Sequence, residues 1–192
     1  MSQHNDCQTR FKLFNMGKTT LYTAVTLDGY IAKSDGSVAF LDDPMYQLPD
    51  EDYGYRAFYD SIDIVLMGYN TYKQISEFET EYPYAGKKSI VISSSSEVAV
   101  SKEGVAVSTD AAEDVLRKLR LSDQNIWIIG GGATNASVHE AGLIDQMILT
   151  YIPITLGSGI PLFRSNNTSQ QWRNMGSRSF PNGLVQITLA RK

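Results

Sequence analysis

Three consecutive glycines, Gly130 to Gly132, are the residues in this chain best suited to bind an anion. The residues before them, 126–129, are apolar and rich in β-branched side chains, which predicts a strand that ends at the first glycine. A helix is predicted to follow from Thr134 to Ala141. Because glycine lets other groups approach the backbone and a helix N-terminus presents free N–H groups, this turn could hold a phosphate. A turn that only lets strand and helix pack tightly is the alternative, since glycine motifs alone are weakly specific.

The composition excludes several classes of partner. Lys and Arg total 17 against 21 Asp and Glu, so the chain has no cationic excess for binding nucleic acid. Cys7 is the single cysteine and His4 and His139 are the two histidines, which predicts neither a disulfide framework nor a zinc site, and we expect no metal. Apolar runs are far shorter than the roughly 20 residues of a membrane-spanning helix, so no membrane partner is expected.

The N-terminal residues 1–17 lack the apolar stretch of a secretory signal. We expect them to form a flexible tail in front of one domain over residues 18–192, in a protein that works in the cytoplasm.

The remaining elements predict an α/β fold. Apolar or β-branched runs indicate strands, several of them buried on both faces as in a parallel sheet, at 21–26, 64–67, 89–92, 105–107 and 147–151. Helices are predicted at 50–61, which opens with three acids, at 71–78, and at 110–120 with Asp110 as the N-cap. Pro181-Asn182-Gly183 predicts a hairpin between two C-terminal strands.

We therefore expect a three-layer fold. Its central mixed sheet is mostly parallel, carries an antiparallel C-terminal hairpin and is flanked by helices. A long excursion over residues 32–49 is predicted to form a lid or a substrate wall.

Small and hydroxyl-bearing residues follow three of the predicted strands, at 68–71, 93–95 and 130–134. Ligands of open α/β sheets bind beyond the carboxyl ends of the strands, and a dinucleotide is long enough to need several such ends. The G-x-G-x-x-G fingerprint with an acid downstream is absent, which disfavours the standard dinucleotide-binding fold.

Four segments together resemble one family. Residues 26–32 (T-L-D-G-Y-I-A) are similar to an S-L-D-G-x-I-A opening, and 65–72 (V-L-M-G-Y-N-T-Y) to an M-G-R-x-T-[YW] segment. Residues 128–132 match a shared G-G-G turn, and 143–163 are similar to an L-[VI]-D-E-x-x-L…G-x-G-x-x-L-F ending. The chain thus resembles the dihydrofolate reductase superfamily, most closely its riboflavin-biosynthesis reductase branch (the RibD C-terminal domain type), from about Leu21 to Arg191.

This resemblance implies that the chain binds NADPH, takes a small-molecule substrate and forms a homodimer. The backbone of four residues would hold the pyrophosphate: Gly130, Gly131, Gly132 and Ala133. Three residues would begin a second phosphate-binding helix: Gly68, Asn70 and Thr71. Ser93 and Ser94 would face the adenosine ribose, and Ala24 and Ile31 would frame the nicotinamide.

One position departs from the family pattern. Tyr69 stands where the family usually has the Arg that binds the adenosine 2′-phosphate, and a phenol cannot replace a permanently charged guanidinium. Either Lys73 or Lys102 compensates, or NADH binds comparably.

Hydride transfer also needs a proton, from an acid or an ordered water. The resemblance makes Asp52 and Glu51, at the start of the predicted helix, candidate acids, and Asp28 is a third because it lies beside the cofactor site. Helix capping and turn formation are the alternative roles of these carboxylates. Residues 156–159 are expected beside the substrate, and three cations could meet a substrate phosphate: Lys33, Arg56 and Arg164.

The function expected from the resemblance is an NADPH-dependent reductase of a C=N or C=O group, of the 5-amino-6-(5-phosphoribosylamino)uracil type. The H-x-E and P-C-x-x-C motifs of the zinc deaminase are absent, so the reductase would stand alone. A dihydrofolate or pterin reductase of the same fold and a non-catalytic nucleotide-binding module are the alternatives.

Overall fold

The computed structural model describes residues 17–77, 81–100, 102–165 and 167–192. The predicted tail over residues 1–17 therefore lies outside the described residues, apart from Gly17, which is buried.

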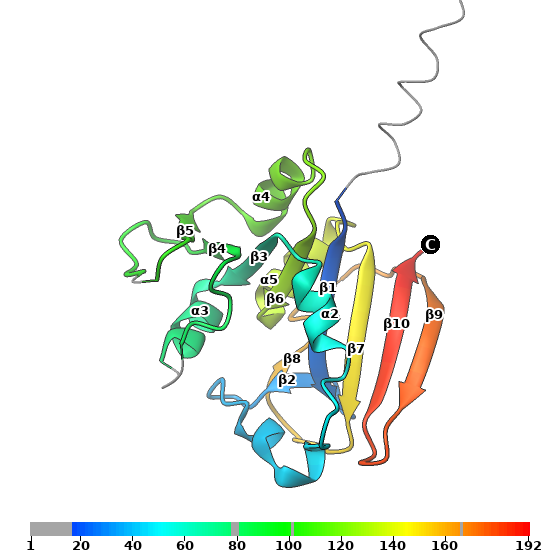
Figure 1. The fold of residues 1–192 in the computed structure, drawn as a ribbon. Helices are drawn as coiled ribbons and strands as arrows, with labels where there is room; N and C mark the ends of the chain where they lie inside the picture. Colours follow the sequence, from blue (N-terminus) through cyan, green and yellow to red (C-terminus); the bar gives the residue numbers. More distant parts are fainter. Residues whose placement is uncertain (1–16, 78–80, 101, 166) are drawn as a thin grey trace, which may run out of the picture.

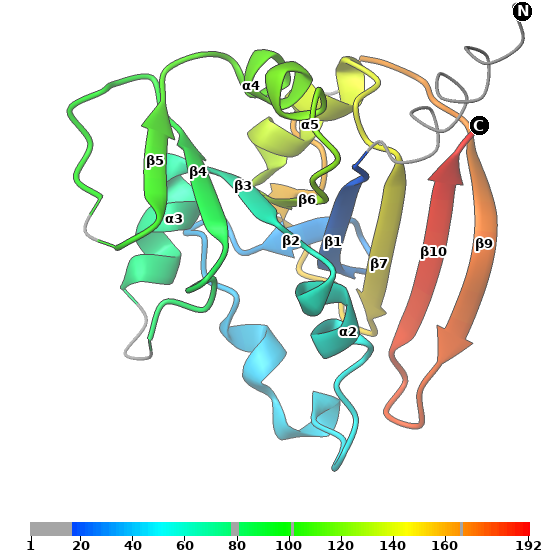
Figure 2. The ribbon, with the colours of Figure 1, turned by 45° about the horizontal axis from the view of Figure 1, so that its top comes forward.

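A single eight-stranded sheet forms the centre of the molecule, in the order β5-β4-β3-β6-β1-β7-β10-β9 (Figures 1 and 2). Its strands are β1 (Thr19–Thr26), β3 (Ile64–Gly68), β4 (Lys88–Ile92), β5 (Val105–Ser108), β6 (Ile126–Gly130), β7 (Gln146–Ile152), β9 (Trp172–Ser179) and β10 (Val185–Arg191). The six strands from β5 to β7 in this order run parallel to one another. In contrast, β10 is antiparallel to both β7 and β9. This arrangement confirms the predicted mixed sheet.

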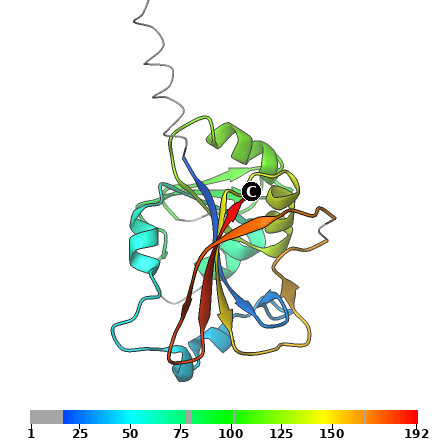
Figure 3. The same cartoon turned by 90° about the vertical axis from the view of Figure 1, so that its right-hand side faces the viewer.

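Helices cover both faces of this sheet, which explains the continuous apolar runs of its central strands. The helices are α2 (Tyr55–Asp60), α3 (Tyr69–Ser76), α4 (Ala112–Leu119) and α5 (Gly132–Glu140). In β3, Ile64 and Leu66 pack into the cluster that contains Val115 and Leu116 of α4, whereas Val65 and Met67 pack into the cluster beside α2 and α3. Seen along the sheet, α2 lies on one side and α4 and α5 lie on the other (Figure 3). None of the helices within the described ranges is long and apolar enough to cross a membrane.

A second, two-stranded sheet joins β2 (Tyr30–Ala32) to β8 (Ile160–Pro161). Between β2 and α2 the chain makes two short 3-10 turns, Ala39–Asp42 and Pro44–Tyr46. This segment is the predicted long excursion, and part of it forms a wall of the cavity described below.

Two details of the helix prediction are wrong. The helix expected from residue 50 begins only at Tyr55, because Asp50, Tyr53 and Gly54 adopt positive φ angles of 61°, 57° and 81°, which a right-handed helix excludes. The N-cap of α4 is Ala111, one residue after the predicted Asp110, whose carboxylate binds Lys118 Nζ at 2.7 Å.

The predicted hairpin turn is confirmed, and a second glycine with positive φ ends the helix after the glycine turn. Gly183, with a φ of 86°, closes the turn of the C-terminal hairpin through an N–H bond to Phe180 O. Gly142, with a φ of 65°, ends α5, and its N–H donates to His139 O.

Candidate active site

A cavity of about 1610 Å³ lies at the carboxyl ends of the parallel strands. Its walls include the residues that follow β3, β4 and β6, and therefore the first turns of α3 and α5. The first turn of α4 adds a further wall. The sheet thus brings three helix N-termini to one hollow, as the strand-end rule predicts.

The N-termini of α3 and α5 lie against each other through two reciprocal contacts. A Cβ placed on Gly131 would lie 3.3 Å from the hydroxyl oxygen of Thr71, and one on Gly68 would lie 3.0 Å from that of Thr134. Neither helix carries an acidic residue in its first turn. Two positive dipole ends therefore face the cavity side by side, which suits a ligand with two linked phosphates.

Position 132 has room only for a glycine, because the backbone of β8 lies directly against it. A Cβ at this position would lie 2.4 Å from the carbonyl oxygen of Pro161, a contact that neither backbone can avoid without moving. The N–H of Arg164 donates to Gly132 O at 3.0 Å, and the side-chain amide of Asn135 donates to Leu162 O at 2.9 Å. These bonds hold the segment after β8 against the glycine turn, which contains a cis peptide between Gly130 and Gly131.

Most of the predicted cofactor-binding residues meet at this cavity. Eight of them line it: Gly68, Asn70, Thr71, Ser93, Ser94, Gly131, Gly132 and Ala133. Gly130 is buried behind the wall, and a Cβ there would lie 4.0 Å from Ile31 Cδ1, so these two residues are neighbours. Ala24 is separate from the lining and packs against an apolar cluster around Tyr46.

Cationic side chains from two parts of the fold line the cavity. Among the described residues that line it, Lys73 and Arg164 carry the positive charges, whereas Lys102 does not reach it. Lys73 follows Tyr69 by one helical turn, and the Tyr69 ring lies beside Tyr72 with the centroids 6.4 Å apart. Of the other predicted phosphate partners, Lys33 lines a separate small hollow and Arg56 is in α2.

Asp28, a predicted catalytic residue, connects two loops. One carboxylate oxygen accepts from the Thr26 hydroxyl at 2.6 Å, and the other accepts from the N–H groups of Leu156 and Gly157 at 2.9 and 2.7 Å. The Thr26 bond is the main cause of the lowered pKa of Asp28, and the two N–H bonds act in the same direction. This contact brings the predicted 156–159 segment beside the start of β2.

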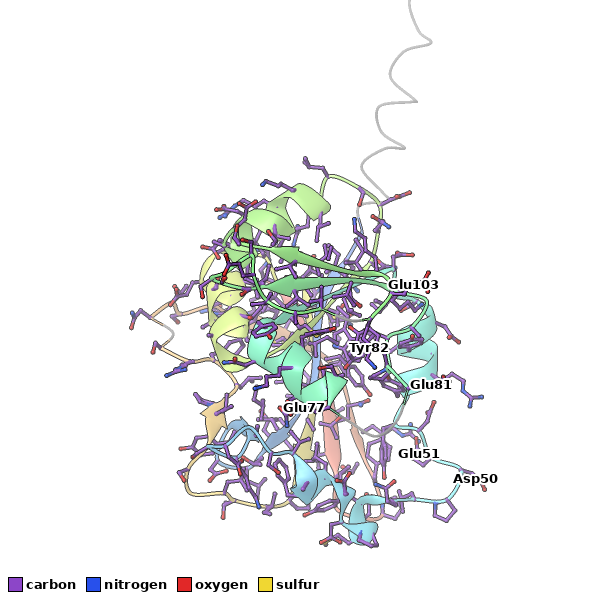
Figure 4. All side chains as sticks on the ribbon, turned by 90° about the vertical axis from the view of Figure 1, so that its left-hand side faces the viewer. Asp50, Glu51, Glu77, Glu81, Tyr82 and Glu103 are labelled. Carbon is purple, nitrogen blue, oxygen red and sulfur yellow. The ribbon has the colours of Figure 1, made fainter. Side chains whose placement is uncertain are left out.

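The other two candidate acids hold the approach to α2. The Asp52 carboxylate accepts from the N–H groups of Arg56 and Gly54, which lowers its pKa. Glu51 accepts from the N–H of Tyr53 at 2.8 Å and forms an ion pair with Arg178 at 2.5 Å. None of the three candidate acids lines the cavity. Figure 4 shows Glu51 on the loop before α2, apart from Glu77, which lines the cavity at the end of α3.

Residues 38–54, here called the covering segment, pack over β1 on the side of Ala24. Its side chains form an apolar cluster with residues of β7 and the C-terminal hairpin: Tyr46, Leu41, Leu48 and Tyr53 with Ile152, Ile154, Phe180 and Leu184. The Tyr53 hydroxyl donates to Tyr46 O at 2.6 Å and accepts from the Asn182 amide at 2.8 Å. This side of the strand is therefore filled by the chain's own side chains.

Several residues of the cavity were not predicted as site residues, and two of them bind each other. Glu113 of α4 and Ser137 of α5 both line it, and the Ser137 hydroxyl donates to the Glu113 carboxylate. That bond is the main cause of the lowered pKa of Glu113. The sequence contains a signal for Glu113, an acid in the first turn of a predicted helix, but that signal indicates capping. Among the residues placed in the structure, no three His, Cys, Asp or Glu side chains are grouped to hold a metal.

The protein-family model of the RibD C-terminal domain matches residues 18–186 of this chain. The chain belongs to the RibD C-terminal domain family. This confirms the resemblance drawn from the four sequence segments.

Two relatives agree with this assignment. The chain is 35% identical over 163 residues to YwjB of Bacillus subtilis (strain 168), a protein named as uncharacterized, covering 85% of this chain and 92% of YwjB. A Shewanella sp. PV-4 structure whose name assigns it to riboflavin biosynthesis is 29% identical, with a TM-score of 0.79 over 91% of this chain and 99% of that one.

A more distant structure shares the fold. Dihydrofolate reductase from Enterococcus faecalis, complexed with NADP(H) and RAB-propyl, has a TM-score of 0.63 at 17% identity, covering 92% of this chain and 98% of its own. The RibD C-terminal domain of this chain therefore has a reductase fold, related to riboflavin-pathway reductases and to dihydrofolate reductase.

Proposed function

We propose that this RibD C-terminal domain protein is an NADPH-dependent reductase that transfers hydride to a C=N or C=O group. Its substrate would be a small heterocycle of the 5-amino-6-(5-phosphoribosylamino)uracil type, and it would act as a cytoplasmic homodimer. The observation that carries the proposal is the cavity in which the N-termini of α3 and α5 meet without an acid in either first turn.

The residues present fit a dinucleotide. Backbone N–H groups from Gly131 to Ala133 and from Asn70 to Thr71 would hold the pyrophosphate, because both sets open helices towards the same hollow. Ser93 and Ser94 would bind the adenosine ribose, and the neighbouring Gly130 and Ile31 would shape the path towards the nicotinamide. NADPH, when bound, supplies the hydride. The protein supplies the position and excludes water from the reacting atoms.

Lys73 is our candidate for the charge that binds the 2′-phosphate. It lines the cavity one turn after Tyr69, in the helix whose first turn would hold a phosphate, whereas Lys102 lies outside the lining. We expect Lys73→Met to weaken NADPH binding roughly tenfold while leaving NADH unchanged, because a single charge-assisted contact is lost. Lys102→Met is the matched control, and an equal loss for both cofactors would contradict this role.

The proton would reach the substrate from water or from one of the three candidate acids. Lowered pKa values keep Asp28 and Asp52 ionised near neutral pH, and an ionised carboxylate cannot act as a general acid. Both are better suited to positioning the loops that they join. Glu51 would need to leave Arg178 to act.

The experiment that tests the function is a titration with NADPH and NADH followed by nicotinamide fluorescence. Steady-state oxidation of NADPH with a ribosylaminopyrimidine and with dihydrofolate would follow. Binding of NADPH with turnover of the ribosylaminopyrimidine is expected. Turnover of dihydrofolate alone would favour the pterin reductase, and a protein that does not bind NADPH would contradict the proposal.

A non-catalytic nucleotide-binding module is the second candidate, because all three candidate acids are already engaged in contacts within the protein. This candidate expects NADPH to bind without oxidation by either substrate. Measurable turnover that is lost in Glu51→Gln, with an unchanged melting temperature, would exclude it.

A further inference from the structure

The three helix N-termini at the cavity differ in charge. The first turns of α3 and α5 contain no acid, whereas the first turn of α4 contains Glu113 and Asp114. Only Glu113 of these two lines the cavity, and the other binds Arg117 at 3.3 Å. The negative charge of Glu113 already occupies the positive end of the α4 dipole and repels a phosphate, so this wall suits a hydrogen-bond donor.

The order of the strands places Glu113 at one end of the cavity. The proposed nicotinamide end lies at β1, and the phosphate-binding turns follow β6 and β3. The next strands in the sheet are β4 and β5, after which α4 begins. The lining at this far end includes Ile92, Ser93 and Ala112, so Glu113 stands beyond the ribose where the base of a dinucleotide would lie.

We propose that Glu113 recognises the exocyclic amino group of the adenine, with Ser137 holding its carboxylate in place. This inference rests on the proposed function, because it takes the cavity to bind an adenine dinucleotide. An ionised carboxylate only accepts hydrogen bonds, and the amino group of adenine is a donor. A base with a carbonyl oxygen in place of the amino group would put that oxygen against the Glu113 carboxylate, and both groups are hydrogen-bond acceptors.

The bond from Ser137 supports this role in two ways. It fixes one carboxylate oxygen, because the hydroxyl comes from a different helix, and the remaining lone pairs are left for a ligand. It also lowers the pKa of Glu113, which keeps the side chain ionised at neutral pH.

The test compares the dissociation constants of NADPH and its hypoxanthine analogue, deamino-NADPH, by nicotinamide fluorescence. The wild type is expected to bind NADPH at least roughly tenfold more tightly than deamino-NADPH. A site that accepts a hydrogen bond from an amino group rejects the analogue that lacks this group. Glu113→Gln should reduce this ratio to about one, since an amide can donate to the carbonyl oxygen of the analogue. Ser137→Ala should give an intermediate ratio, because the carboxylate then loses its fixed orientation.

Asp114→Asn is the matched control, since it removes an acid from the same helical turn outside the cavity, and its ratio should equal that of the wild type. Equal affinity of the wild type for both dinucleotides would overturn the role of Glu113 and leave the proposed function standing. The same ratio in Glu113→Gln and the wild type would also overturn it. If neither dinucleotide bound, the proposed function would fail as well.

Discussion

The two sides of β1 are built in opposite ways. On the side of the glycine turn, the first turns of α3, α4 and α5 border a large cavity. On the side of Ala24, the covering segment fills the space with aromatic and aliphatic side chains. Backbone N–H groups of the glycine turn are present whatever the side chains are, whereas Lys73 and Glu113 add side-chain groups to the same cavity. The apolar cluster depends entirely on side chains, so substitutions can alter it more readily than they alter the glycine turn.

The contacts also differ in their range along the chain. The glycine turn and the helix that it opens are neighbours in sequence, and one motif determines both. The Tyr53 side chain, in contrast, is bound by Asn182, 129 residues away, and its carbonyl oxygen by Gln186, 133 residues away. A substitution at Tyr53 should therefore affect mainly the apolar cluster, and one in the glycine turn mainly the cavity.

The largest effect is expected for Gly132→Ala. The added Cβ would lie 2.4 Å from Pro161 O, so either the glycine turn or β8 has to move. We expect a loss of about 1–3 kcal/mol in the free energy of unfolding and a decrease in NADPH affinity of at least roughly tenfold. Urea unfolding measures the change in the free energy of unfolding, and fluorescence titration measures the change in NADPH affinity.

Gly176→Ala is the control, since a Cβ there meets nothing within 4 Å. Unchanged NADPH binding in Gly132→Ala would show that the turn is not the phosphate site.

A smaller effect, confined to the other side, is expected for Tyr53→Phe. It removes the hydroxyl that binds Tyr46 O and the Asn182 amide, which should lower the free energy of unfolding by about 1–2 kcal/mol. NADPH affinity should not change. Tyr55→Phe, at a side chain that is 38% exposed, controls for the loss of a phenol. A parallel loss of cofactor affinity would contradict the separation of the two sides.

The smallest effect concerns pH and Asp28. Because the folded-state pKa of this carboxyl is lowered, its contribution to stability is present above the ordinary value of 3.8 and is lost as the pH falls through the folded pKa. Asp28→Asn should therefore be less stable than the wild type at neutral pH. The free energies of unfolding of the two proteins, plotted against pH, should converge in acid. A constant difference between the curves from pH 7 to pH 2 would contradict this.

Much of the cofactor side could be predicted from the sequence, because a strand buried on both faces is a continuous apolar run and a glycine turn is a local motif. The start of α2 could not, since Asp50 and Tyr53 take left-handed conformations that tertiary contacts stabilise. Asp110 matches an N-cap pattern, but the nearby Lys118 competes for its carboxylate. The pairing of Glu113 with Ser137 depends on how two helices approach each other, and no local pattern in the sequence contains that information.

One stretch of chain, residues 156–164, connects the loop of Asp28 with the glycine turn. Its N–H groups at Leu156 and Gly157 bind Asp28, and further along Arg164 binds Gly132 O. A substitution within it can therefore disturb the Asp28 loop and the glycine turn at once, and a change in either one alone would not identify which contact was lost.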